Sequence, residues 1–196
     1  LGGNGLHVHY SLWSEGRNIF ANDGRLSETG RQFLAGLQNR ICETSICGAA
    51  NVNAYRRRAP YTFCPTTNSW GVDNRTVALR VIEGADQAVR IEKRDAGADC
   101  NPYILLAADI AAGLDGIGRS AAPTEATTGN AYEDSSLEKL PADLETAIAA
   151  ARKSKWLSSV LGQDLHDLWL QQAQRESTFF SQQVTPFETE RYLTRF

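Results

Sequence analysis

The chain has 196 residues, of which 42% are hydrophobic, enough for one sizeable globular domain. Twenty Lys and Arg against 23 Asp and Glu give a net charge of −3, which argues against a general nucleic-acid or membrane-surface binder. No apolar run approaches the roughly 20 residues that a membrane span needs. The four cysteines show no CxxC spacing and no signal peptide is visible, so we expect free thiols in a cytoplasmic protein.

The first part of the chain alternates strand and helix signals. Residues 6–13 have the alternation of a strand, and Ile19–Phe20 are predicted to start a second, short one. Ser27 has the character of a helix N-cap, and apolar residues at helical spacing predict a helix over 28–41. Residues 42–55 are rich in small and polar side chains, which favours a loop.

Two strands are predicted in the middle of the chain, after an ordered loop. Pro60 and Pro65 interrupt residues 56–65, so this arginine-rich stretch is not a regular element. Residues 76–82 and 89–94 each alternate as strands around a turn. We expect these two strands to pair antiparallel.

Helices dominate the remainder. Residues 103–114 are apolar nearly all round and predict a buried helix, followed by a surface loop over 119–136. From Pro141 on, apolar residues recur at helical spacing in three segments, and the tail from Pro186 is predicted as a fourth helix. His166 falls on a polar helix face, where we expect it to be solvated. Strands first and helices after predict an α+β fold.

The strand over 89–94 presents a charged face. Side chains on alternate residues of a strand share a side, so Arg90, Glu92 and Arg94 lie about 7 Å apart on one face. Arginines beside a carboxylate suit phosphate and carboxylate ligands.

A second strand carries two of the three histidines on one face. His7, His9 and Ser11 share that face by the same alternation. A single histidine on a strand is usually structural. Two histidines that lie beside Glu92 of a neighbouring strand instead indicate part of a metal and nucleotide site.

Five separated stretches, in order, resemble the C-terminal catalytic region of the glutamine synthetase family. Together they extend over essentially the whole chain, and their order makes the match specific. They are Gly3-Asn4-Gly5-Leu6-His7-Val8-His9, Asn53-Ala54-Tyr55-Arg56-Arg57 with Pro60, Asn74-Arg75-Thr76, Arg90-Ile91-Glu92-Lys93-Arg94, and Asn101-Pro102-Tyr103 leading to Ala112-Gly113-Leu114-Asp115-Gly116-Ile117.

The resemblance implies a fold and a domain assignment. It implies antiparallel strands of a glutamine synthetase/guanido kinase-like catalytic domain, followed by C-terminal helices, with residues 1–196 as the C-terminal part of that domain. The family's N-terminal β-grasp domain and the first part of the catalytic domain have no counterpart in these residues. The chain begins at Leu1 and contains no methionine, so we expect it to be the back part of a longer protein.

The resemblance also implies residue roles. His7 and Glu92 would be ligands of a divalent cation, Mg²⁺ or Mn²⁺. The other roles concern the two substrates, glutamate and ATP. His9 and Ser11 would contact the nucleotide with Arg90 beside its pocket, Arg75 and Arg80 would contact the ATP phosphates, Arg75 would stabilise the transferring phosphoryl group, and Arg57, Arg94 and the Gly3 backbone would bind glutamate.

The implied reaction has two steps. ATP phosphorylates the γ-carboxylate of glutamate, and an amine then attacks the acyl phosphate. Phosphoryl transfer needs positioning and charge neutralisation more than covalent help, which explains why arginines and metal ligands dominate.

One position departs from the pattern of the ammonia-using members. Counting without gaps from Tyr55, the glutamate that those enzymes use to bind and deprotonate ammonium falls on Phe63. A phenyl ring cannot take a proton but can contact a larger, partly apolar amine. Residues 70–75 are similar to the branch that γ-glutamylates polyamines and other organic amines.

Three hypotheses follow. The first is an ATP-dependent glutamate–amine ligase with an organic amine or polyamine as nucleophile. The second is an ammonia-using glutamine synthetase, and the third is a non-catalytic structural or regulatory member of the family. In the family the site forms between subunits of a ring-shaped homo-oligomer, so we expect residues 1–196 alone to be inactive.

Overall fold

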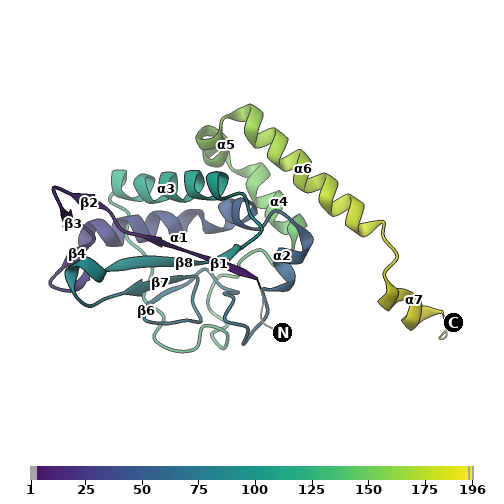
Figure 1. Ribbon diagram of the computed structural model, residues 1–196, viewed down its shortest axis with the longest axis horizontal. Helices are drawn as coiled ribbons and strands as arrows, with labels where there is room; N and C mark the ends of the chain where they lie inside the picture. Colours follow the sequence, from purple (N-terminus) through teal and green to yellow (C-terminus); the bar gives the residue numbers. More distant parts are fainter. Residues whose placement is uncertain (1–3, 194, 196) are drawn as a thin grey trace.

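A four-stranded sheet forms the centre of the molecule. The computed structural model describes residues 4–193 and residue 195 (Figure 1). The sheet has the strand order β1-β8-β7-β6, where β1 is Gly5–Tyr10, β8 is Arg90–Gly97, β7 is Leu79–Ile82 and β6 is Trp70–Val72. The expected antiparallel pairing of β7 with β8 is confirmed, and β1 pairs antiparallel with the other edge of β8.

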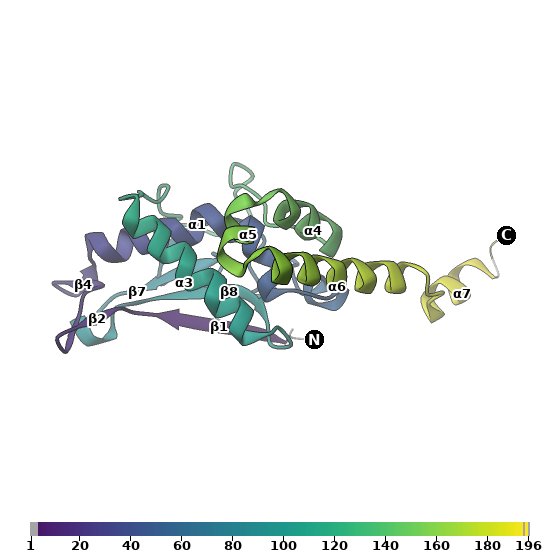
Figure 2. The ribbon, with the colours of Figure 1, turned by 90° about the horizontal axis from the view of Figure 1, so that it is seen from above.

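Helices α1 (Glu28–Gly48) and α3 (Pro102–Gly118) lie side by side across one face of this sheet (Figures 1 and 2). A core of aromatic and aliphatic side chains fills the space between helices and sheet. Phe33, Leu37 and Ile91 are among its fully buried members. The opposite face of the sheet is left to the loops and to the side chains of Arg90, Glu92 and Arg94 of β8.

The two helices approach closely because glycines line their crossing. A Cβ atom on Gly36 would overlap the Ala112 carbonyl, and one on Gly116 would overlap the backbone of α1. Only glycine permits backbones to come this near. The crossing places Asp109 of α3 over the centre of the sheet.

The predicted N-terminal strand is shorter than the alternation suggested. It ends at Tyr10, and Trp13–Ser14 (β2) pairs instead with Arg17–Asn18 (β3) in a hairpin. A second small hairpin joins Ala21–Asn22 (β4) to Arg25–Leu26 (β5). The prediction of a strand at Ile19–Phe20 is wrong, because Phe20 turns inward and is fully buried against Phe33.

The predicted loop over residues 42–55 is also wrong. Helix α1 continues to Gly48, and a short helix, α2 (Val52–Arg56), follows it. Small and polar residues have weak helix propensity, but Ser45, Ile46 and Cys47 are fully buried against neighbouring helices. Tertiary packing therefore outweighs local preference here. The N-cap at Ser27 is as expected, since its hydroxyl accepts from the Gly30 amide at 3.1 Å.

Two further differences concern β-structure and exposure. β7 begins at Leu79 rather than at residue 76, and β6, a three-residue strand parallel to β7, had no sequence signal. Helix α3 is not buried all round: Tyr103, Ile110 and Leu114 are exposed on its outer side, while Leu105 and Ala108 face the core.

The C-terminal helices form where they were predicted. They are α4 (Leu144–Lys153), α5 (Lys155–Leu161), α6 (Gln163–Ser181) and α7 (Pro186–Tyr192), the last standing away from the body at the end of α6 (Figure 2). The first three enclose a second core cluster with the end of α1. None of the helices in the described part of the chain has the length and hydropathy needed to cross a membrane.

Candidate functional site

The residues singled out on β1 and β8 lie on one face of the sheet. In the register of the ladder His9 lies opposite Glu92, and Glu92 lies opposite Arg80 of β7. Residues opposite each other in a sheet point to the same side. Glu92 is therefore flanked by an imidazole on one strand and a guanidinium on the other, and it is 5% exposed.

The two carboxylate oxygens of Glu92 have different partners. Oε2 accepts from Arg94 Nη1 at 2.9 Å and from Arg80 Nη1 at 3.3 Å. Oε1 faces His7 Nδ1 at 3.2 Å and His9 Nε2 at 3.6 Å. One oxygen is thus neutralised by arginines, and the other points toward the two histidines, which are partly exposed.

These contacts determine the protonation states. Burial opposes ionisation of Glu92, but the Arg94 hydrogen bond and charge outweigh it and keep the pKa of Glu92 below its usual value. Burial, followed by the Arg94 charge, lowers the pKa of His7 despite the nearby carboxylate, and burial also lowers the pKa of His9. At neutral pH the site therefore combines a carboxylate with two neutral imidazoles, the form in which histidine can bind a metal.

Arg90 fixes the orientation of one imidazole. Its Nε donates to His9 Nδ1 at 3.2 Å, and its Nη1 donates to the Ala88 carbonyl at 2.6 Å. Because Nδ1 accepts, the proton of neutral His9 lies on Nε2, which faces Glu92. Ser11 lies just beyond the end of β1, where its hydroxyl accepts from Trp13 Nε1 at 3.0 Å.

The loop after α2 brings two further predicted residues to the same face. Arg57 Nη2 donates to the carbonyls of Asp95 and Ala96 at 2.9 and 2.7 Å, which orients its guanidinium beside the start of β1. Arg94 Nη2 donates to the Phe63 carbonyl at 3.2 Å. Phe63 itself is 64% exposed, and its backbone φ angle is 57°. Arg94 therefore joins the loop to Glu92.

Arg75 lies at the periphery of this face. It is exposed and lines, together with Arg80, a cavity of about 650 Å³ between the end of β6 and residues 128–130. Arg80 also forms an ion pair with Asp73 at 2.9 Å. Two cations thus face one open cavity next to Glu92. Gly3, the remaining predicted site residue, lies outside the described residues.

The donor set fits a divalent cation in part. His7 and Glu92 offer one nitrogen and one oxygen, a combination that Mn²⁺ accepts and that Mg²⁺ would supplement with oxygen ligands. In the described part of the chain, no group of three or more His, Cys, Asp or Glu side chains is arranged to hold a metal ion. Glu92 Oε2 is already neutralised, so further ligands would have to come from other chain segments, from water or from a nucleotide.

The opposite face of β8 contains charged residues that the sequence analysis did not consider. Lys93 and Asp95 point toward the helices, and Lys93 Nζ lies 3.1 Å from Asp95 Oδ1 and 3.0 Å from Asp109 Oδ1. All three side chains are at most 2% exposed. The available signal was charge at core-facing positions of a strand, which is rare unless the charges are paired.

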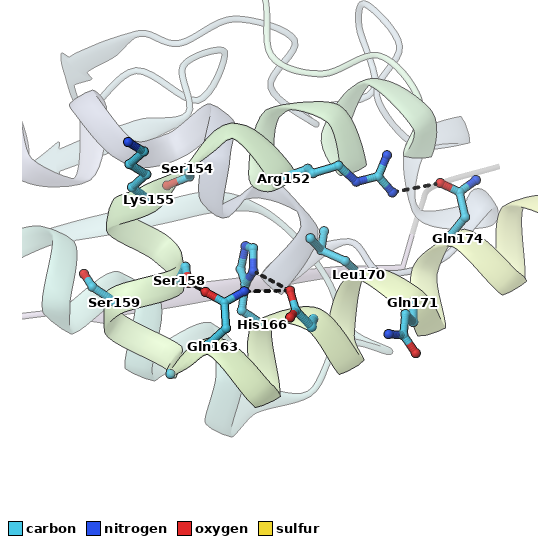
Figure 3. A pocket seen from close by; sticks show the side chains of 12 residues that line it. Arg152, Ser154, Lys155, Ser158, Ser159, Gln163, His166, Leu170, Gln171 and Gln174 are labelled. Atoms are coloured by element: carbon cyan, nitrogen blue, oxygen red, sulfur yellow. Dashed lines mark hydrogen bonds and ion pairs between the residues drawn. The ribbon is translucent and has the colours of Figure 1, made fainter.

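A separate cavity of about 810 Å³ lies between α4, α5 and α6 (Figure 3). His166 lies within it, 5% exposed with Nε2 3.1 Å from the Ala151 carbonyl, so the prediction that His166 is solvated is wrong. The polar side chains around it pair with one another, as Arg152 does with Gln174 at 3.2 Å. Among the described residues, none of those predicted to form the site lines this cavity.

Comparison with known proteins gives consistent matches along the chain. The family model described as glutamine synthetase, catalytic domain, matches residues 1–192. Gamma-glutamylethanolamide synthetase GlnA4 of Streptomyces coelicolor is 37% identical over 100% of this chain and 42% of its own length. Glutamate–isopropylamine ligase of a Pseudomonas species is 37% identical over 97% of this chain and 43% of its own. Glutamine synthetase of Halobacterium salinarum is 33% identical over 100% and 46%.

A solved structure agrees with these matches. A GmaS/ADP complex superposes with a TM-score of 0.87 at 32% identity, covering 97% of this chain and 46% of that one. The chain spans less than half the length of the relatives it matches. The order of the motifs, the mixed sheet with its C-terminal helices and the family match over 192 residues agree: the chain belongs to the glutamine synthetase family.

Proposed function

We propose that the protein is an ATP-dependent ligase that joins the γ-carboxylate of glutamate to an amine through γ-glutamyl phosphate. The observation that carries this proposal is the face of the sheet around Glu92. There the Glu92 carboxylate and two neutral imidazoles are accompanied by five arginines, which lie on β7, on β8 and in the neighbouring loops. Such an arrangement suits the binding of several anionic groups at once.

The arginines divide into two groups by position. Arg57 and Arg94 lie beside the loop that carries Phe63, which supports a role in binding the carboxylates of glutamate. Arg75 and Arg80 face the open cavity, which supports a role in binding the phosphates of ATP. The proposed reaction needs the two substrates to meet in line, and Glu92 lies between the two groups.

A divalent cation, Mg²⁺ or Mn²⁺, is part of the proposal. His7 and Glu92 would hold it, and when bound it would neutralise phosphate charge during transfer. His9 and Ser11 are proposed to contact the nucleotide, with Arg90 holding His9 in one tautomer. Arg75 is proposed to stabilise the charge on the transferring phosphoryl group.

Phe63 supports an organic amine as the second substrate. Its exposed ring lies at the position where ammonia-using members carry a carboxylate, so it offers apolar contact and no base. A relative named for the synthesis of γ-glutamylethanolamide and one named for the ligation of glutamate to isopropylamine each match at 37% identity. An ammonia-using enzyme is the alternative, supported by relatives named glutamine synthetase. The paired Glu92 cluster argues against a non-catalytic protein.

The proposal extends to partners. The face around Glu92 supplies two protein metal ligands, too few for the near-octahedral oxygen-rich site of Mg²⁺. The remaining ligands are proposed to come from the first half of a longer chain and from neighbouring subunits of a ring-shaped homo-oligomer. Residues 1–196 alone are therefore expected to show no turnover.

The test is phosphate release from ATP by the full-length protein with glutamate. Ammonium, putrescine, spermidine and ethanolamine are supplied in parallel with Mg²⁺ or Mn²⁺. We expect an organic amine to give the highest kcat/KM. Highest turnover with ammonium would establish the alternative, and no turnover with any amine, in protein shown to be folded, would establish a non-catalytic role.

A further inference from the structure

The core face of β8 carries a closed set of four charges. Lys93 forms ion pairs with Asp95 and with Asp109 of α3. Asp95 is also 3.6 Å from Arg58 Nη2, and the Arg58 side chain is 2% exposed. With both carboxyl groups ionised, the two cations and two carboxylates make the set neutral. Tyr10 of β1 completes it by donating its hydroxyl to Asp109 Oδ2 at 2.7 Å.

This network joins several elements at one point. Lys93 and Asp95 belong to β8, Asp109 to α3 and Tyr10 to β1. Arg58 adds the loop after α2, and it donates to Ser45 of α1 at 2.8 Å and to the Pro141 carbonyl at 2.7 Å. These partners are distant in sequence, so the network fixes how the strand, two helices and the loop lie relative to one another.

Every member except Asp109 is adjacent in sequence to a residue of the candidate site. Lys93 separates Glu92 from Arg94, so its position fixes the two peptide units that carry them. Arg58 follows Arg57 directly, and Asp95 gives its backbone carbonyl to Arg57 while its side chain faces Arg58. A displacement of the buried residues on the core face of β8 would therefore also move the residues on its site face.

The charge states of Lys93 and Asp95 agree with this geometry, whereas burial raises the pKa of Asp109 despite the neighbouring Lys93. Burial alone would lower the pKa of Lys93, but Asp109 and Asp95 outweigh it and raise that pKa, so Lys93 is a cation. Burial opposes ionisation of Asp95, but Lys93 and Arg58 outweigh it and lower its pKa. A buried ion pair rarely adds stability over an apolar pair of similar volume, because desolvation offsets the attraction. Stability alone is thus a weak reason for placing these charges here.

We propose that Lys93, Asp109 and Tyr10 are positioning residues of the candidate site. They tie β8 and β1 to α3 and thereby set the places of Glu92 and Arg94 and, through Asp95 and Arg58, of Arg57. This inference rests on the proposed ligase function for its activity readout. It also predicts a physical property of β8 that does not depend on that function.

The main test is a full-length variant with Lys93→Met, Asp109→Leu and Tyr10→Phe. The three changes replace a neutral set by apolar side chains and leave the Asp95–Arg58 pair in place. We expect a melting temperature close to that of the wild type, with kcat/KM for glutamate lowered between about tenfold and a hundredfold, the range that small misplacements produce. Amide hydrogen exchange in β8 should be faster than in the wild type.

A matched control separates positioning from general stability. Leu157→Ala removes a side chain that is 1% exposed from the second core cluster, and Leu157 takes part in none of the hydrogen bonds or ion pairs of the network. It should lower the melting temperature while leaving kcat/KM per folded molecule and β8 exchange unchanged. A triple variant with wild-type kcat/KM and wild-type β8 exchange would overturn the proposal.

Two remaining outcomes are also decisive. If the triple variant does not fold, Asp109→Asn, which keeps an acceptor for Tyr10, takes its place; lowered kcat/KM per folded molecule supports the proposal and full kcat/KM overturns it. If the wild type has no ligase activity, the proposed function fails. The rate of amide hydrogen exchange in β8 of the variant is then the only test of the positioning role. Faster exchange at an unchanged melting temperature then supports positioning, and unchanged exchange overturns it.

Discussion

Charged side chains on the two faces of β8 have opposite surroundings. On the site face Glu92 meets Arg94 and Arg80 at one oxygen, while its other oxygen is directed toward partly exposed histidines. On the core face Lys93 is enclosed between two carboxylates and is 2% exposed. One strand thus supports a face with a carboxylate oxygen directed toward exposed groups and a face whose charges are paired only with one another. If the positioning proposal is right, the strand can present charges for binding because its other side is held in place.

The largest effect on the unfolding free energy is expected from removing a single charge from the core face of β8. Asp109→Leu leaves Lys93 beside Asp95 with only one of its two carboxylates and leaves the Tyr10 hydroxyl without its acceptor. Breaking a buried ion pair in this way costs about 3–5 kcal/mol of unfolding free energy. Thermal or urea unfolding of the full-length protein measures it. Adding Lys93→Met to Asp109→Leu should recover most of the loss, and no recovery would show that the ion pair is not the cause.

Removing one charge from the site face should affect the rate of the reaction more than the stability of the protein. Glu92→Ala removes the carboxylate that Arg80 and Arg94 surround and that is proposed to bind the metal. We expect turnover to fall by at least about a hundredfold, the effect of losing one strong electrostatic stabiliser. The unfolding midpoint should fall less than in Asp109→Leu, because both histidines are partly exposed and the buried Arg94 keeps the Phe63 carbonyl as a partner. Steady-state phosphate release gives the rate, and near wild-type turnover would remove Glu92 from the site.

Much of the site face could be predicted from sequence, whereas the core face could not. The period of two in a strand is enough to put Arg90, Glu92 and Arg94 on one side, and the register of β1 then brings His9 opposite Glu92. The partner of Lys93 is a residue of α3, and no local pattern specifies which helix residue lies above a strand.

The missed elements have similar causes. The end of α1 forms because Ile46 and Cys47 are buried between helices, a tertiary effect that outweighs the weak propensity of the segment. β6 has three residues and is defined by its parallel pairing with β7, so it lacks a signal of its own. The exposed side of α3 was taken as buried because an apolar sequence does not show which side has a partner.

A substitution of Phe63 should change the specificity for the amine without disturbing either face of β8. Phe63→Glu adds a carboxylate at an exposed loop position, where it can bind an ammonium ion and accept its proton. An organic amine also loses apolar contact, worth about 0.8 kcal/mol per buried methylene. We therefore expect the ratio of kcat/KM for ammonium to that for the best organic amine to rise several-fold or more. Phe63→Gln is the control for shape without charge. If the wild type uses ammonium best and Phe63→Glu leaves this ratio unchanged, the role proposed for Phe63 is wrong.

The smallest effect is expected from changing Tyr10, the uncharged member of the network on the core face of β8. Tyr10→Phe keeps the ring that packs against Phe33, at a centroid distance of 5.8 Å, and removes only the hydroxyl that donates to Asp109. Asp109 keeps its ion pair with Lys93, so about 1.5–3 kcal/mol of unfolding free energy should be lost with one buried hydrogen bond to a charged group. Turnover per folded molecule should fall less than in the triple variant. A loss as large as that of Asp109→Leu would mean that the hydroxyl, and not the Lys93 ion pair, dominates the core face of β8.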